Sequence, residues 1–291
     1  MWHEPTRTIS APPESGTVVA RPRPAVLRLV RAPWLARRLR DLAALWLFAA
    51  LVALWWVWSA GSSSLYFPPL HAIVARLYDL WIVGDAKGQL VSSLENFGLG
   101  YAIAGVAGVG IGALLWSLRW LKEPVSPFLY FLYVLPAPVL IPAVMAIFGI
   151  GVAMKVVIIA FAAVWPTLLN TLDGMLGVDP VKLDTARALG IPGPRVVRSV
   201  VLPAALPQIV AGLRNSLQVS VILMVVSEMV ASTSGIGFFI LNAQQSFAIV
   251  DMWTGIIVLA LIGSALNLLF VAIESRVLHW HYGARATGEK A

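Results

Sequence analysis

Apolar residues gather along the chain into six runs of about twenty, and most charged residues lie in the stretches between them. A helix needs about 20 mainly apolar residues to cross the hydrocarbon core of a bilayer. The pattern therefore predicts an all-α, polytopic membrane protein with about six transmembrane helices and with both termini on one side. The expected spans are Leu42–Ala60, Phe97–Trp116, Pro127–Ile150, Ala153–Leu172, Gly212–Ala231 and Trp253–Ile273.

The composition supports lipid as the solvent of this chain. Hydrophobic residues make up 59% of the sequence and charged residues 12%, whereas soluble domains are about 45–50% apolar and about 25% charged. The absence of cysteine excludes disulfides, thiol catalysis and thiolate metal sites. His279 and His281 flank Trp280 near the C-terminus, and we interpret them as part of an interfacial tail, not as metal ligands.

The net charge of +7 suits a membrane topology better than a nucleic-acid partner, because the basic residues gather on one side of the expected spans. That side has eight arginines within residues 1–41, and the opposite side has only Arg76 and Lys87. The positive-inside rule therefore places both termini in the cytoplasm, and we expect the membrane to be a bacterial inner membrane. The remaining basic residues of the cytoplasmic side are Arg119, Lys122, Lys182, Arg187, Arg195, Arg198, Arg276, Arg285 and Lys290.

The expected organisation has one membrane domain with a tail at each end. The Arg/Pro-rich N-terminal tail is expected to be disordered and to contact lipid headgroups, and the first span to remain as an uncleaved anchor. An amphipathic helix over Leu70–Trp81 is expected on the outer membrane surface. The segments in order are the tail 1–41, the first helix 42–60, the outer loop 61–91, the membrane core 92–275 and the cytoplasmic tail 276–291.

Two spans have distinctive small or helix-breaking residues. Ala104, Gly108 and Gly112 recur every fourth residue, a pattern that lets two helix backbones approach closely. The third span contains three prolines, each of which removes a backbone donor. They predict either a broken helix near a transport path or a kinked structural helix. These prolines are Pro136, Pro138 and Pro142.

The loop between the fourth and fifth spans predicts a compact helix–turn–helix in the cytosol. Asp179 suits an N-cap and Pro180 suits a first helical turn, while Gly190 suits the position after a helix end. A short helix of about 15 Å is expected over Pro180–Leu189. A second helix is expected from Gly193. From the residues alone, an ordinary surface loop is the other interpretation.

Specific residues of this loop resemble the cytoplasmic signature of ABC importer permeases, Glu-Ala-Ala, three residues, Gly, nine residues, Ile-x-Leu-Pro. The chain has Asp184-Thr185-Ala186, Gly190 and Leu202-Pro203 at that spacing, with Val200 in place of Ile. Other segments resemble the sulfonate/nitrate/taurine branch of the binding-protein-dependent permeases, so the likeness covers about 65–280. These segments are Phe148–Gly151, Leu169–Thr171, Leu202–Pro207, Ser227–Met229 and Asn242–Gln245.

The resemblance implies a type I ABC importer-like fold and a permease subunit that moves a small, anionic solute into the cytoplasm. Its implied partners are an ABC ATPase dimer, a second permease copy in a homodimer and a periplasmic substrate-binding protein. The coupling helix, within residues 180–203, would dock on the ATPase. The residues implied in coupling are Asp184, Thr185, Ala186, Gly190, Leu202 and Pro203.

The same resemblance places the energy source on another polypeptide. The sequence has no G-x-x-x-x-G-K-[ST] phosphate loop. We therefore expect ATP and Mg on the partner ATPase, no cofactor or metal on this chain, and no catalytic residues. The chain is not expected to be an enzyme.

A polar stripe on the fifth span is a candidate translocation path. Arg214, Gln218 and Glu228 share one helical face with Val221 and Val225. Intramembrane ionisable residues are often functional. The alternative is that Arg214 and Glu228 are interface residues at opposite ends while Gln218 bonds a neighbouring helix.

Lys155, near the outer end of the fourth span, is a further path candidate. It could attract an anion, but we favour a side chain that extends to the headgroups. The outer loop Ser232–Val250 is rich in glycine and polar residues and resembles a gate and docking region for the binding protein.

Two other classes of protein fit the sequence less well. A secondary transporter needs ionisable groups near mid-membrane, often within inverted repeats, and the sequence shows no repeat. A membrane enzyme needs paired carboxylates, a histidine cluster or an activated serine. Asp173, Asp179 and Asp184 share one loop without a histidine.

Overall fold

The structure, a computed structural model, describes the backbone of residues 33–280 and the side chains of residues 46–280 apart from 119, 121 and 122. The chain divides into a unit ending at Ala53 and a second unit beginning at Leu54. The first contains most of α1 (Pro33–Ser59), which begins before the expected first span. The expected disordered tail lies outside the described residues up to residue 32, as does His281 at the other end.

The described residues form helices and no strands. Four helices are long and apolar enough to cross a membrane, and they overlap the second, fourth, fifth and sixth expected spans but extend beyond most of them. The prediction of an all-α, polytopic membrane protein is confirmed. These four are α3 (Lys87–Ser117), α6 (Val152–Leu176), the continuous helix Gly193–Val230 and α11 (Ile249–Val277).

The third expected span, Pro127–Ile150, is wrong as a single straight helix. Its residues form α4 (Arg119–Val134), a 3₁₀ turn and α5 (Ile141–Phe148), with an 83° bend between the two halves. Pro136 cannot donate a backbone hydrogen bond, and Leu135 before it takes an extended ψ of 121°. The prolines therefore break the helix, as one of the two interpretations predicted.

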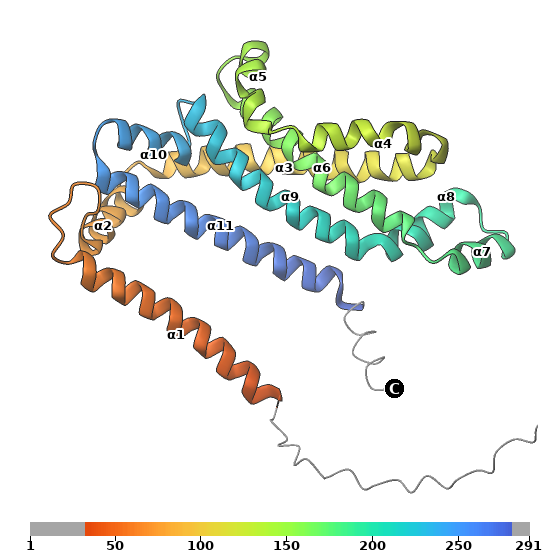
Figure 1. The fold of residues 1–291 in the computed structure, drawn as a ribbon, viewed down its shortest axis with the longest axis horizontal. Helices are drawn as coiled ribbons and strands as arrows, with labels where there is room; N and C mark the ends of the chain where they lie inside the picture. The colour runs from red at the N-terminus through yellow and green to blue at the C-terminus, as the bar shows by residue number, and fades with distance from the viewer. Residues whose placement is uncertain (1–32, 281–291) are drawn as a thin grey trace, which may run out of the picture. The chain divides into compact units, whose positions relative to one another are not determined.

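The core of the second unit is a bundle in which α6 packs along both α3 and the C-terminal part of the fifth span, α9 (Leu202–Val230) (Figure 1). The small residues of α3 face α6, because a Cβ at Gly108 would lie 2.7 Å from the Thr167 side chain. The same Thr167 side chain also contacts α9, because its hydroxyl and that of Ser216 are 2.6 Å apart and buried. The predicted close approach along the stripe that includes Gly108 and Gly112 is confirmed.

Short helices lie at the two ends of this bundle. We call them the α7 end, after α7 (Pro180–Ala188), and the α10 end, after α10 (Ile236–Gln245) (Figure 1). At the α10 end, α2 (Leu70–Leu77) continues through a π-helical turn, Tyr78–Val83. We expected this helix only to lie on the membrane surface, but it also packs on α11.

Two polar contacts fix α2 and its π-helical turn to α11. The guanidinium of Arg76 donates to Asp251 at 2.7 Å, and the Trp81 indole donates to the Thr254 hydroxyl at 3.1 Å. The carboxylate of Asp251 raises the pKa of Arg76 further above its ordinary value, through the hydrogen bond and the opposite charge. The amphipathic helix is therefore tied to the bundle by its polar side as well as by its buried apolar residues.

Candidate functional site

α7 is a short capped helix in the connection between α6 and the fifth span. The Asp179 side chain accepts a hydrogen bond from the Val181 amide at 2.9 Å, and Pro180 occupies the first turn. The helix ends at Ala188, one residue before the expected end, and Gly190 follows in the left-handed region with φ +68°. The predicted short helix is confirmed.

The C-terminal end of α7 is closed by backbone hydrogen bonds. The Gly190 amide donates to the Arg187 carbonyl at 2.9 Å, and the Ile191 amide donates to the Ala186 carbonyl at 3.0 Å. The second bond is the wide closing bond of a Schellman-type end, which requires the left-handed residue between. Because both ends of α7 are satisfied internally, the helix can act as a rigid projection.

The signature residues of α7 point in different directions. Asp184 and Arg187 are exposed and pair with each other at 2.8 Å. The Thr185 hydroxyl donates to the Val181 carbonyl of its own helix. Ala186 is only 3% exposed. The resemblance implies a coupling role for Ala186, but the chain itself covers this residue, so its small size serves internal packing.

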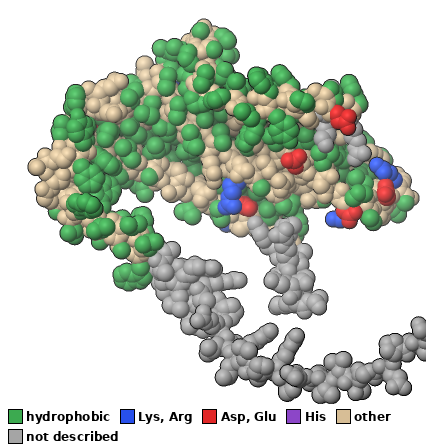
Figure 2. All heavy atoms as spheres, in the orientation of Figure 1, with side chains coloured by type: hydrophobic (Ala, Val, Ile, Leu, Met, Phe, Trp, Pro, Cys, Tyr) green, Lys and Arg blue, Asp and Glu red, His purple; other side chains and the backbone are tan. Residues whose placement is uncertain are grey.

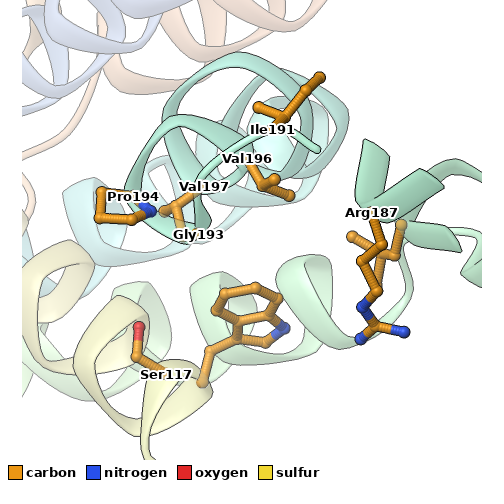
Figure 3. A pocket seen from close by; sticks show the side chains of 9 residues that line it. Ser117, Arg187, Ile191, Gly193, Pro194, Val196 and Val197 are labelled. Atoms are coloured by element: carbon orange, nitrogen blue, oxygen red, sulfur yellow. The ribbon is translucent and has the colours of Figure 1, made fainter. Parts of the chain in front are cut away.

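A hollow of 790 Å³ lies beside α7, between this helix, the end of α3 and the start of the fifth span (Figure 3). Figure 3 shows Arg187 on one side of the hollow and Gly193 and Pro194 on another. Charged side chains gather at the α7 end in the view of Figure 2, while hydrophobic atoms cover much of the remaining visible face. The residues that line the hollow are Trp116, Ser117, Leu183, Arg187, Ile191, Gly193, Pro194, Val196 and Val197.

Leu202 and Pro203 lie at a change of helical form, not at the start of a separate helix. The second helix begins at Gly193 as expected, and α8 (Gly193–Val196), a π-helical turn (Val197–Val201) and α9 form one continuous helix. The Leu202 amide donates to the Val197 carbonyl, five residues back. Pro203 has no amide hydrogen, so the wider turn accommodates a position where the regular pattern cannot continue.

The structure does not bring the polar stripe of α9 together as one surface. Arg214 is partly buried and pairs with Glu274 of α11 at 3.4 Å. Gln218 is exposed on the chain, whereas Glu228 is fully buried. The three residues are on one helical face by spacing, but the neighbouring elements cover the stripe unequally.

Lys155 does not extend to the membrane surface, so the interpretation that we favoured for it is wrong. The residue is 1% exposed, and its Nζ lies 3.5 Å from both the carbonyl and the hydroxyl oxygen of Ser234. The charge of Glu228 also acts on it. Lys155 is therefore held inside the chain by oxygen atoms and an opposite charge.

Glu228 lies in a buried polar cluster that the sequence did not reveal. Its two carboxylate oxygens are each 2.8 Å from the Ser93 hydroxyl of α3, and one accepts the Gly237 amide at 3.0 Å. Ser93 is also fully buried. Serine is too common for its position to have signalled this role, and only the glycines near Gly235 hinted at a tightly built loop.

A second hollow was also not predicted. It measures 260 Å³ and lies where the broken third span meets α6 and α9. Three aromatic residues, Tyr133, Phe161 and Trp165, contribute to its lining.

Among the residues that the structure describes, no group of three or more His, Asp or Glu side chains could hold a metal ion.

Residues 100–279 match the family described as binding-protein-dependent transport system inner membrane component. SsuC of Bacillus subtilis strain 168, a putative aliphatic sulfonates transport permease protein, is 30% identical over 234 residues, which cover 80% of this chain and 85% of the relative. TauC of Escherichia coli K12, a taurine transport system permease protein, is 30% identical over 242 residues, with 80% and 87% coverage. NrtB of Leptolyngbya laminosa, a nitrate import permease protein, is 28% identical over 240 residues, with 79% and 85% coverage.

Solved structures share the fold. A chain of the inward-facing MetNI methionine ABC transporter gives a TM-score of 0.56 at 20% identity, covering 65% of this chain and 94% of that chain. A chain of an amino acid ABC transporter with histidines gives 0.51 at 21% identity, covering 69% and 94%. The predicted type I ABC importer-like fold is confirmed.

Proposed function

The chain belongs to the family of binding-protein-dependent transport system inner membrane components, and from this premise we propose that α7 is its docking helix for a separate ATP-hydrolysing subunit. The chain is a permease subunit of an ABC importer. The observation that carries the proposal is the construction of α7: a helix capped at both ends that projects from the connection between two spanning helices.

Movement of α7 can reach the spanning helices because its base is packed against them. Met175 of α6 and Val178, two residues after this helix ends, form one buried cluster with Val201, Ala205 and Ile209 of the continuous helix Gly193–Val230. Well-packed interiors transmit displacement instead of absorbing it. A partner that moved α7 would therefore also move α6 and α9, which fits a rigid-body switch between two states.

The exposed surface of α7 offers apolar as well as charged contacts. Val181 is 68% exposed and Leu189 is 72% exposed, on either side of the Asp184–Arg187 pair. A mixed surface of this kind suits a folded protein partner better than lipid. ATP and Mg would be bound by that partner, because the sequence has no phosphate-binding loop.

We place the α7 end in the cytoplasm and the α10 end outside, with both termini cytoplasmic. The basic residues of the tails and of the α7 segment support this orientation. The proposed assembly has two copies of this chain, two ATPase subunits and a binding protein that delivers solute to the α10 end. The similarity to permeases named for aliphatic sulfonates, taurine and nitrate supports a small solute with an anionic oxygen-bearing group.

Docking is tested with a charge introduced into the exposed apolar surface of α7. Leu189→Asp should abolish co-purification with the ATPase and ATP-dependent uptake in proteoliposomes, because the carboxylate would be buried against the partner. Val83→Asp is the matched control, since Val83 is 69% exposed at the α10 end and is not expected to touch the ATPase. Equal retention of the ATPase by both variants would contradict docking at α7. Uptake driven by an ion gradient without ATP would instead indicate a secondary transporter.

We propose that Gln218 contributes to the translocation path. Its side chain is exposed on α9, between Arg214, which pairs with Glu274, and the buried Glu228. Gln218→Leu should abolish uptake while leaving assembly with the ATPase normal. Ile222→Val serves as a control on the same helix, because Ile222 is also exposed and remains apolar. Unchanged uptake by Gln218→Leu would remove this residue from the path.

A further inference from the structure

A buried polar cluster lies at the α10 end, the end of the bundle opposite α7 (Figure 1). It combines residues from three spanning helices: Ser93 of α3, Lys155 of α6 and Glu228 of α9. None of the three is more than 1% exposed. Burying ionisable groups is costly unless they are fully hydrogen-bonded or paired, so such a cluster must be closely satisfied by its surroundings.

The cluster satisfies the first turn of α10. Three successive backbone amides at the start of that helix each donate to a side chain: Gly235 to Gln89 at 2.6 Å, Ile236 to Ser93 at 2.8 Å and Gly237 to Glu228 at 3.0 Å. The first amides of a helix have no partner within the helix itself. Here α3 and α9 supply all three acceptors, so the start of α10 is bonded to two spanning helices at once.

The backbone of this turn is shaped to admit the carboxylate. Gly235 has φ +112°, and a Cβ at this position would overlap the carboxyl group of Glu228. A Cβ at Gly237 would lie 2.5 Å from the Val225 carbonyl oxygen and 2.8 Å from the Glu228 side chain. Both glycines therefore allow the loop to close around Glu228.

A fourth set of contacts ties in α6. The Ser92 and Ser234 hydroxyls are 2.9 Å apart, and Ser234 is also the residue that the Lys155 ammonium approaches. α3, α6 and α9 thus all contact the short segment from Ser234 to Gly237. This segment is therefore not free to act as a hinge at the start of α10.

We propose that Glu228, together with Ser93 and Lys155, is a positioning latch that joins α10 rigidly to the α3–α6–α9 bundle. The inference rests on the proposed function, because it treats α7 as the place where movement starts. The helix from Gly193 to Glu228 is continuous and about 50 Å long. When the α7 end of this helix is displaced, the whole helix moves, including Glu228. The latch then makes α10 move together with the bundle and not relative to it.

Disulfide trapping tests the latch directly, and the chain has no cysteine of its own to interfere. Ser92→Cys with Ser234→Cys replaces hydroxyls 2.9 Å apart by sulfurs that can bond at about 2.05 Å. The pair should oxidise readily in the assembled transporter. Failure to form the bond would overturn the proposed geometry.

Transport by the trapped protein separates a rigid joint from a moving gate. If α10 moves with α3, the oxidised double variant should import solute as fast as the same protein after reduction. Import that stops on oxidation and returns on reduction would overturn the latch, because α10 would then have to part from α3. The reduced double variant should import solute like the parent chain. If it shows no ATP-driven import although the parent chain does, the two serines are needed for another reason, and this result counts against the latch. If the parent chain itself shows none, the proposed function fails independently of the trapping result.

The role of Glu228 is tested in the same cysteine background. Glu228→Gln keeps the shape but removes the charge and one acceptor, so the rate of disulfide formation should fall at least about tenfold. Glu95→Gln is the matched control, since Glu95 is exposed on α3 two residues from Ser93. Ser93→Ala should act like Glu228→Gln, while co-purification with the ATPase should stay unchanged in all three variants. Equal trapping rates in Glu228→Gln and Glu95→Gln would refute a latch built on Glu228.

Discussion

At the α7 end, Asp184 and Arg187 pair with each other while both side chains remain about 70% exposed. At the α10 end, Glu228 and Lys155 lie buried among hydroxyls and backbone amides. Both ends use charged residues close to a short helix. They differ in whether those charges are surrounded by solvent or buried inside the chain.

This difference suits two different tasks. An exposed ion pair contributes little to stability and can be rearranged at low cost, so it remains available to a docking partner. A buried carboxylate loses its partners only at a large cost, so it fixes the elements that surround it. The comparison supports the proposed docking surface at one end and the proposed fixed joint at the other.

The largest expected effect is the loss of the buried carboxylate. Glu228→Ala should destabilise the protein by about 3 kcal/mol, because it leaves the Gly237 amide and the Ser93 hydroxyl without an acceptor and Lys155 without its neighbouring charge. Asp184→Ala should cost less than about 0.5 kcal/mol. Thermal unfolding in detergent compares the two variants. Similar losses at both ends would show that burial does not distinguish the two sites.

Glycine substitutions should show the same contrast with a smaller effect. Gly237→Ala places a Cβ against the Val225 carbonyl and should cost about 1–3 kcal/mol. Gly193→Ala at the α7 end meets open space and should change stability by less than about 0.5 kcal/mol. Unfolding midpoints measured under one set of conditions decide between them, and a Gly193→Ala loss as large as that of Gly237→Ala would contradict the expectation.

The smallest expected effect asks whether burial or position matters, since the Arg76–Asp251 pair is at the α10 end but is partly exposed. A double-mutant cycle with Arg76→Ala and Asp251→Ala should give a coupling of about 0.2–1 kcal/mol that weakens in high salt. Asp251 raises the pKa of Arg76. As long as the Asp251 carboxylate is ionised, the contribution of Arg76 is therefore complete below the ordinary pKa of Arg76 and would be lost only at a higher pH. Unfolding measurements at pH 6 and pH 9 should therefore give the same coupling. A coupling that disappears by pH 9 would contradict this assignment.

Local patterns predicted the features that depend on local causes. The cap at Asp179, the left-handed Gly190 and the close face of Gly108 follow from the chemistry of single residues and from helical spacing. The break near Pro136 was one of two interpretations, because proline disturbs a helix but its neighbours decide whether the helix bends or ends.

The candidate site was less predictable because its residues gain their roles from distant elements. Helical spacing placed Arg214, Gln218 and Glu228 on one face, but burial separates them. Ser93 is 135 residues from Glu228 in the chain and had no local signal of its own. Lys155 has a side chain long enough to reach a membrane surface, and the oxygens of Ser234 hold it inside instead.

The amino-acid sequence alone determined that this chain resides in lipid, which stretches of it form most of the spanning helices, and that a capped helix projects between two spans. These properties follow from apolar length and from the backbone preferences of glycine, proline and aspartate, which act over a few residues. The tertiary structure decided which charges are covered and which partners they find. Burial and hydrogen bonding between α3, α6, α9 and α10 depend on how separate segments meet in space, and helical periodicity carries no information about that meeting.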